Sequence, residues 1–278
     1  MTNVNLAVSN IAWEPSQDDA VADLLRRAGV GGVEIAPTKW RQRPLEASSA
    51  DIAAYRRRWE DRGLPIVSLQ ALFFGRPDLH LFGDARSRAE MLAYLRGIMR
   101  LGAGLGARAF VFGSPKNRLR GSVSLPEALD IATRFFRAAA GYASEHGAAL
   151  CIEANPPTYG CDFITTTVEA VELCRLVDHP AVRVNADLGG MTMSNENVRA
   201  SLQTAKSFIG HFHASEPNLT PLGASADHDA AASALDAIGY SGWVSIEMRA
   251  STNQAGDENI AAVENAVRLA LGAYGRVV

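Results

Sequence analysis

The sequence has few cysteines, no signal-like start and no long apolar run. Its three cysteines, Cys151, Cys161 and Cys174, cannot all pair with one another and show no zinc-type spacing. No apolar stretch approaches the roughly 20 residues that a membrane-spanning helix needs, and the first five residues lack the basic and apolar segments of a secretory signal. We therefore expect a cytoplasmic protein in which Cys151 and Cys174 are small apolar fillers.

The sequence also lacks an excess of charge of either sign. A net charge of -3 gives no electrostatic footprint for nucleic acid or for an anionic membrane. The basic cluster Arg56-Arg57-Arg58 is most simply the solvated face of a helix. With 47% hydrophobic and 21% charged residues in 278, the chain can bury a sizeable core. We expect neither a nucleic acid nor a membrane as a partner.

Short apolar runs alternate with longer amphipathic segments from end to end. Eight of the short runs are hydrophobic almost throughout, which is typical of parallel strands buried on both faces. The expected strands cover residues 5–9, 32–36, 66–70, 109–112, 149–153, 182–187, 209–213 and 243–247. Eight strands separated by helices predict a (β/α)8 TIM barrel of one domain over residues 1–278. A doubly wound open sheet is the alternative, but no Gly-x-Gly-x-x-Gly follows the first strand.

Helices are expected between these strands. Ser16 is the expected N-cap of the first helix, which ends before Gly29, and Ser124 begins another that stops at Gly147. The other expected helices cover residues 49–62, 85–101, 166–178, 194–206, 227–238 and 257–274.

Four acid or imidazole side chains close the last four strands. Glu153, Asp187, His213 and Glu247 are separated by 34, 26 and 34 residues, each about long enough for one helix and one return strand. A single Glu at a strand end is more often solvated or salt-bridged. Four such residues at four strand ends favour a functional site instead, because the carboxyl ends of barrel strands meet at one rim, where barrel enzymes place catalysis.

Three carboxylates and one imidazole at one place would repel each other unless a cation lies between them. Oxygen-rich ligation with one imidazole suits one divalent ion, Mn²⁺, Mg²⁺ or Co²⁺, better than a structural zinc. Such an ion can bind two vicinal oxygens of a hydroxy-ketone and polarise its carbonyl. Glu153 and Glu247 would face each other across the ring, so we expect them to be the acid/base pair that moves the proton of the adjacent carbon.

These motifs resemble those of the xylose-isomerase-like TIM barrels, also called sugar phosphate isomerase/epimerases. The resemblance covers essentially the whole chain and is most specific in residues 151–156 (Cys-Ile-Glu-Ala-Asn-Pro), Asp187, His211-Phe212-His213 and residues 239–247. Members such as the ketose 3-epimerases hold one divalent ion with Glu, Asp, His and Glu, which match Glu153, Asp187, His213 and Glu247. In that family the two glutamates pass a proton through an enediolate.

The chain departs from the ketose epimerases at two positions. They carry a histidine three residues after the metal aspartate, where this chain has Gly190, and an arginine a few residues after the metal histidine, where it reads Ala214 to Leu219. Both differences put a simple free ketose in question as the substrate. The endonuclease branch needs more histidines than the six present, three of which (His80, His146 and His179) lie away from the expected rim.

Further residues near the expected rim are candidates for substrate contacts. His211 should point to the same side of its strand as His213, although a satisfied core histidine is equally expected. Glu34 could add a polar contact, or be a buried acid paired with an arginine. Trp13, Phe73, Phe74 and Tyr159 could form an apolar wall for a sugar, or simply pack. The proposed substrate-binding residues are His211, Lys116, Trp13, Glu216, Asn155 and Phe73.

Three functions remain open. The first is a divalent-metal-dependent isomerase or epimerase of a sugar, keto-sugar or related polyol. The second is a lyase or dehydratase, in which the same enediolate expels a leaving group from the next carbon of a keto-sugar or keto-cyclitol; Gly190 would leave room for a bulkier substrate. The third is a non-catalytic or partner-dependent barrel that binds a sugar-like ligand. The expected partner is a small sugar-like molecule, and the chain could form a homo-oligomer.

Overall fold

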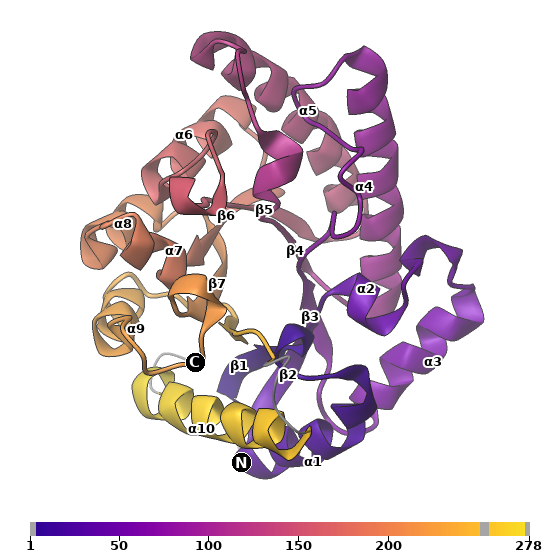
Figure 1. Ribbon diagram of the computed structural model, residues 1–278, viewed down its shortest axis with the longest axis vertical. Coiled ribbons are helices and arrows are strands. Elements are labelled where there is room, and N and C mark those ends of the chain that lie inside the picture. The colour runs from indigo at the N-terminus through magenta and orange to yellow at the C-terminus, as the bar shows by residue number, and fades with distance from the viewer. Residues whose placement is uncertain (1–3, 251–255, 276–278) are drawn as a thin grey trace.

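Eight parallel strands close into a barrel in sequence order (Figure 1). The structure is a computed structural model and describes residues 4–250 and 256–275. Each strand pairs with the next in parallel, and β1 also pairs with β8, which closes the ring. The predicted (β/α)8 TIM barrel is confirmed. The strands are β1 Val4–Ser9, β2 Val30–Ile35, β3 Ile66–Leu69, β4 Ala109–Phe112, β5 Ala149–Glu153, β6 Val182–Asp187, β7 Ile209–Ser215 and β8 Val244–Glu247.

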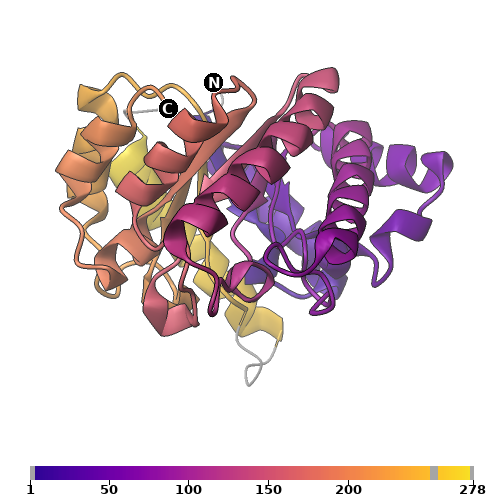
Figure 2. The same cartoon turned by 90° about the horizontal axis from the view of Figure 1, so that it is seen from above.

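Helices form a layer outside the strands, as the two views show (Figure 1, Figure 2). Most of the longer helices begin at a Ser, Thr, Asp or Asn whose side chain accepts the amide three residues on, as at Ser48 and Asp84. The predicted start at Ser124 is confirmed in the same way. The helices are α1 Asp18–Ala28, α2 Pro37–Trp40, α3 Ser49–Glu60, α4 Ala85–Leu105, α5 Leu125–Glu145, α6 Thr167–Val177, α7 Leu188–Met193, α8 Val198–Ala205, α9 His228–Ala237 and α10 Gly256–Tyr274.

Two predicted helix starts are wrong, and each has a local cause. Ser16 lies inside a 3₁₀ turn, Pro15–Gln17, whose capping box joins Glu14 and Gln17, so α1 begins only at Asp18. The helix expected from residue 194 begins at Val198, because residues 188–193 already form α7 directly after β6. In α7 the carboxylate of Asp187 is the N-cap, which turns the chain at the end of the strand.

Apolar packing fills the space between the strands and the helices, whereas the barrel interior contains a polar group. Phe112 of β4 is completely buried and packs edge-on against Phe135 and Phe136 of α5. Glu34, Ser68 and Ser245, from β2, β3 and β8, are also completely buried. The Glu34 carboxylate hydrogen-bonds to β7, which is not a neighbour of β2, so this contact crosses the interior. The core therefore holds a buried carboxylate below the rim.

Cys151, Cys161 and Cys174 are all buried and free. Among the helices of residues 4–250 and 256–275, none combines the length and the apolar character that crossing a membrane requires.

Candidate metal centre

The four side chains predicted to converge do so. Glu153, Asp187 and Glu247 are the last residues of β5, β6 and β8, and His213 lies near the end of β7. The register sets Asp187 opposite His213, so neighbouring strands present their side chains at one level. Each residue offers one ligand atom, and these four atoms all lie within 4.8 Å of one another. The convergence at one rim that the strand spacing predicted is thus confirmed.

His213 lies at the centre of the cluster. Its Nδ1 is 3.1 Å from Oε2 of Glu247, 3.4 Å from Oε2 of Glu153 and 3.8 Å from Oδ2 of Asp187. The imidazole is 1% exposed, whereas the three carboxylate side chains keep 10–14% of their surface exposed. The site therefore opens to solvent on the side of the carboxylates and is closed below the ring.

Two amides and one glycine hold the carboxylate of Glu153 in place. Asn155 Nδ2 donates to Oε1 of Glu153 and Asn185 Nδ2 donates to Oε2, each at 2.7 Å. A Cβ on Gly113, just after β4, would overlap this carboxylate. Asn155, predicted as a substrate contact, thus contacts Glu153, and Asn185 and Gly113 are contributors that sequence reasoning missed.

Asp187 is fixed from two sides. Its Oδ1 accepts the amide of Gly190 at 2.5 Å, and its Oδ2 accepts the hydroxyl of Ser215 at 2.5 Å. A Cβ on Gly190 would lie 2.9 Å from Oδ1 of Asp187, so this close approach of the backbone depends on the missing side chain. Gly190 thus helps to orient a candidate ligand.

Burial and neighbouring charge shift the ionisation of these groups in different directions. Burial, followed by the charges of Glu153 and Glu247, raises the pKa of Asp187 to about 7. Burial also raises the pKa of Glu247 above its ordinary value, despite the nearby imidazole. Burial would raise the pKa of Glu153 as well, but His213, Asn155 and Arg118 outweigh it and the pKa falls. Burial opposes the charge on His213, yet the charges of Glu34 and Glu247 lift its pKa well above the ordinary value.

The donor set fits a divalent cation. Three carboxylates held this close repel one another, and a raised pKa at Asp187 and Glu247 is the expression of that repulsion and of burial. Carboxylate oxygens with one imidazole are ligands that divalent ions such as Mn²⁺ accept. Among the described residues, Oδ1 of Asn185 is also a buried atom without a hydrogen-bond partner.

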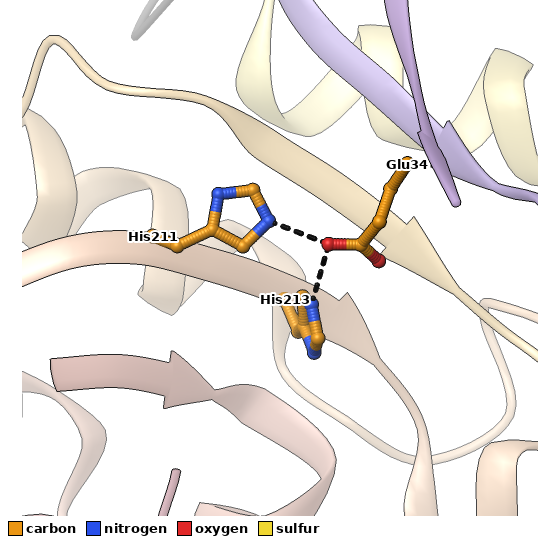
Figure 3. Close-up of side chains that lie close together, drawn as sticks. All are labelled: Glu34, His211 and His213. Atoms are coloured by element: carbon orange, nitrogen blue, oxygen red, sulfur yellow. Dashed lines mark hydrogen bonds and ion pairs between the residues drawn. The ribbon is translucent and has the colours of Figure 1, made fainter. Parts of the chain in front are cut away.

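His213 also belongs to a second cluster, with Glu34 and His211 (Figure 3). Oε2 of Glu34 is 2.9 Å from Nε2 of His211 and 3.2 Å from Nε2 of His213, and it also accepts the hydroxyl of Ser68 at 2.7 Å. Oε1 faces the hydroxyl of Ser245 at 3.3 Å. Glu34 is therefore a buried acid, as one alternative expected, but its partners are two histidines and not an arginine.

Arg118 is a buried cation that links β4 to β5. The side chain is 1% exposed, and its guanidinium donates to the carbonyls of Phe112 and Glu153 at 3.3 Å and 2.6 Å. Its charge is one of the influences that lower the pKa of Glu153. The structure buries Arg118 and leaves Lys116, a predicted substrate contact in the same loop, exposed.

Other predicted substrate residues have structural contacts of their own. Glu216 is completely buried, and its oxygens accept the amides of residues 223–226 and lie 3.1 Å from Nε2 of His228. Trp13 is completely buried and donates to Asp18 at 2.8 Å. Phe73 is 2% exposed and packs edge-on against Phe112. Each of the three residues thus has contacts within the protein that do not involve a ligand. Their role in substrate binding stays a prediction.

Known proteins resemble this chain in sequence pattern and in fold. The family model described as xylose isomerase-like TIM barrel matches residues 22–269. No match to the sequence is found among the curated proteins. Several solved structures share the fold at identities too low to show more than the fold.

Three of these solved structures are two sugar epimerases and a protein solved with a zinc atom. D-psicose 3-epimerase from Clostridium cellulolyticum H10, crystallised with D-tagatose, has a TM-score of 0.80 and 18% identity, with 98% of each chain covered. The E. coli 3-keto-D-glucoside 4-epimerase YcjR has a TM-score of 0.76 and 18% identity, covering 96% of this chain and 99% of its own. The IOLI protein, solved with a zinc atom, has a TM-score of 0.77 and 19% identity, covering 98% and 99%.

Proposed function

Because the chain belongs to the xylose isomerase-like TIM barrel family, we propose that it is a divalent-metal-dependent isomerase or epimerase of a sugar, keto-sugar or related polyol. The observation that carries the proposal is the meeting of four ligand atoms, from Glu153, Asp187, His213 and Glu247, within 4.8 Å at the carboxyl ends of the strands. The sugar epimerases among the structures of the same fold support the substrate class.

The four residues would hold the cation together. A bound Mn²⁺, Mg²⁺ or Co²⁺ would supply a Lewis acid that polarises a carbonyl and offsets the charge of the three carboxylates. The exposed edges of these carboxylates leave the solvent side open to a small molecule. The buried ring of His213 closes the opposite side.

Glu153 and Glu247 are suited to opposite halves of a proton transfer. The environment of Glu153 lowers its pKa, which favours the ionised form that can accept a proton from the carbon beside a carbonyl. In the metal-free protein burial raises the pKa of Glu247, the direction that suits the carboxyl group that returns a proton to the enediolate. Two carboxyl groups with diverging pKa values therefore provide a base and an acid within one site.

The proposal is tested by metal analysis and by hydrogen exchange. The purified protein should contain about one divalent ion per chain. Incubation with D-psicose, D-tagatose, D-fructose and 3-keto-glucosides in D₂O should give recovered sugar with deuterium at the carbon next to the carbonyl, and chelation should stop the exchange. A dehydrated product would assign the chain to the lyase alternative. A protein that binds no metal and exchanges no substrate proton would refute the proposal in favour of a non-catalytic barrel.

A further inference from the structure

We infer that Glu34 is a positioning residue, which keeps a proton on Nε2 of His213 and thereby presents Nδ1 to the three carboxylates and to the cation they would bind. Glu34 comes from β2, across the barrel from His213 on β7. The inference rests on the proposed function, because it concerns the orientation of one of the four ligands.

The first argument concerns the Nε2 side of the ring. Oε2 of Glu34 lies 3.2 Å from Nε2 of His213 and 2.9 Å from Nε2 of His211 (Figure 3). An ionised carboxylate only accepts hydrogen bonds. Glu34 is completely buried, with no water exposure to compensate for a lost donor. Both Nε2 atoms must therefore carry hydrogen.

The second argument is independent and concerns the Nδ1 side. Nδ2 of Asn185 donates to Oε2 of Glu153 at 2.7 Å and lies 3.2 Å from Nδ1 of His213. Nδ1 also lies 3.1 Å from Oε2 of Glu247, which accepts hydrogen bonds, so without a cation Nδ1 carries a hydrogen as well. A cation among the three carboxylates would take the place of this hydrogen, whereas Glu34 holds the hydrogen on Nε2. The neutral ring that binds the cation therefore carries hydrogen on Nε2 and offers its lone pair from Nδ1.

His211 supports the same arrangement from below. Its ring stands edge-on to that of His213, with ring centroids 5.2 Å apart, and both rings share one oxygen of Glu34. His211 is 1% exposed. A hydrogen bond on the far nitrogen of a metal-binding histidine fixes the ring orientation and increases its strength as a ligand. Glu34 and His211 therefore form a floor that orients His213.

A second cation between Glu34, His211 and His213 is the competing interpretation, because their ligand atoms also lie close together. Two features oppose it. Oε2 of Glu34 already accepts the hydroxyl of Ser68 at 2.7 Å. A cation on Nε2 would also require His213 to give up the hydrogens of both ring nitrogens while Nδ1 binds the first ion. The geometry thus favours one ion per chain above His213 and hydrogen bonds below it.

The experiment uses the full chain loaded with Zn²⁺, a diamagnetic probe. In ¹⁵N spectra of histidine-labelled protein, with His213 assigned by its loss in His213→Asn, Nε2 should carry hydrogen and Nδ1 should carry the metal. Glu34→Gln keeps the shape of the side chain but removes its charge, and should weaken Zn²⁺ binding about 10- to 100-fold. Ser68→Ala is the matched control: it removes a neutral donor from the same oxygen and should change the affinity only a few-fold.

The outcomes separate this inference from the proposed function. Wild-type protein that binds no Zn²⁺ refutes both. One ion per chain with hydrogen on Nδ1 of His213, or unchanged affinity in a folded Glu34→Gln protein, refutes the positioning role alone. Two ions per chain would also refute it, in favour of the second cation. If Glu34→Gln does not fold, the spectrum of the wild-type protein still decides the tautomer, and Glu34→Asp, which withdraws the carboxylate by one methylene, should weaken Zn²⁺ binding.

Discussion

The hydroxyl of Ser215 donates to Oδ2 of Asp187 at 2.5 Å, and Oγ of Ser215 accepts the amide of Gly189 at 2.9 Å. Ser215 is two residues beyond His213 on β7, so both side chains point to the same side of the strand. One strand therefore supplies a candidate metal ligand and the group that orients the ligand on the neighbouring strand. The cluster is held by contacts between strands as much as by the strands themselves.

Replacing Ser215 with Ala should weaken metal binding without unfolding the protein. The change removes the donor to Oδ2 of Asp187, so that the carboxylate is oriented from the Gly190 side alone, and loss of such a contact typically costs about 10-fold or more in metal affinity. Isothermal titration with Mn²⁺ measures the effect. Ser194→Ala is the control, because the Ser194 hydroxyl donates to the carbonyl of Thr165 instead. Equal affinity in both variants would contradict the role of Ser215.

Glu247→Gln should abolish turnover and retain the fold. The amide cannot exchange a proton in the way a carboxyl group can, and loss of a general acid or base typically costs about 10²- to 10⁴-fold in rate. Deuterium exchange into a ketose, together with circular dichroism, separates catalysis from folding. Glu145→Gln, at an exposed position near the end of α5, should match wild type. Undiminished exchange in Glu247→Gln would remove Glu247 from the mechanism.

The sequence contains enough information to predict the ring of strands and the four rim residues, because both follow from local periodicity and from where each strand ends. Glu34 was open to several interpretations, since its partner His211 is 177 residues away and only barrel closure brings them together. Asn155 and Glu216 are predicted substrate contacts because they lie near the expected rim. Their contacts with Glu153 and with the amides of residues 223–226 depend on loop geometry that no periodicity encodes.

The chelated protein should lose stability as the pH rises from about 6.5 upward. The pKa of Asp187 is raised from 3.8 to about 7, and that of His213 is raised well above 6.5. A raised pKa means that the folded state holds the proton more tightly than the unfolded state, so this stabilisation is lost as the pH rises through the folded value. The lowered pKa values of Glu34 and Glu153 act only in acid. Thermal unfolding with and without Mn²⁺ measures the effect. The melting temperature of the chelated protein should fall over this range, and bound Mn²⁺ should make this fall smaller. A melting temperature of the chelated protein that rises with pH would contradict the prediction.

Metal binding should release protons. Near neutral pH the raised pKa values of Asp187 and His213 leave protons on groups that must give them up to bind a cation. The apparent affinity should therefore fall as the pH decreases from about 8 to 6, by up to about 10-fold per pH unit for each proton displaced. Calorimetric titrations in buffers of different ionisation enthalpy count the protons. Identical heats in all buffers would show that no proton leaves.

Gly113→Ala should displace the Glu153 carboxylate while the barrel remains folded. The added Cβ would lie 3.0 Å from Cδ of Glu153 and closer still to Oε1, so the carboxylate must move away from Asn155 and Asn185. Metal affinity and substrate exchange should both fall, because the proposed function uses Glu153 both as a metal ligand and as the base.

The matched control for this substitution is Gly141→Ala. Gly141 lies within α5, and a Cβ there meets no atom within 4 Å. Ala in a helix interior is more favourable than Gly by up to about 1 kcal/mol, so this variant should unfold at the same or a higher temperature and bind metal like wild type. Calorimetric Mn²⁺ titration of both variants separates a general effect of adding a methyl group from the specific clash. Wild-type metal affinity in Gly113→Ala would show that Glu153 does not need the space that Gly113 leaves.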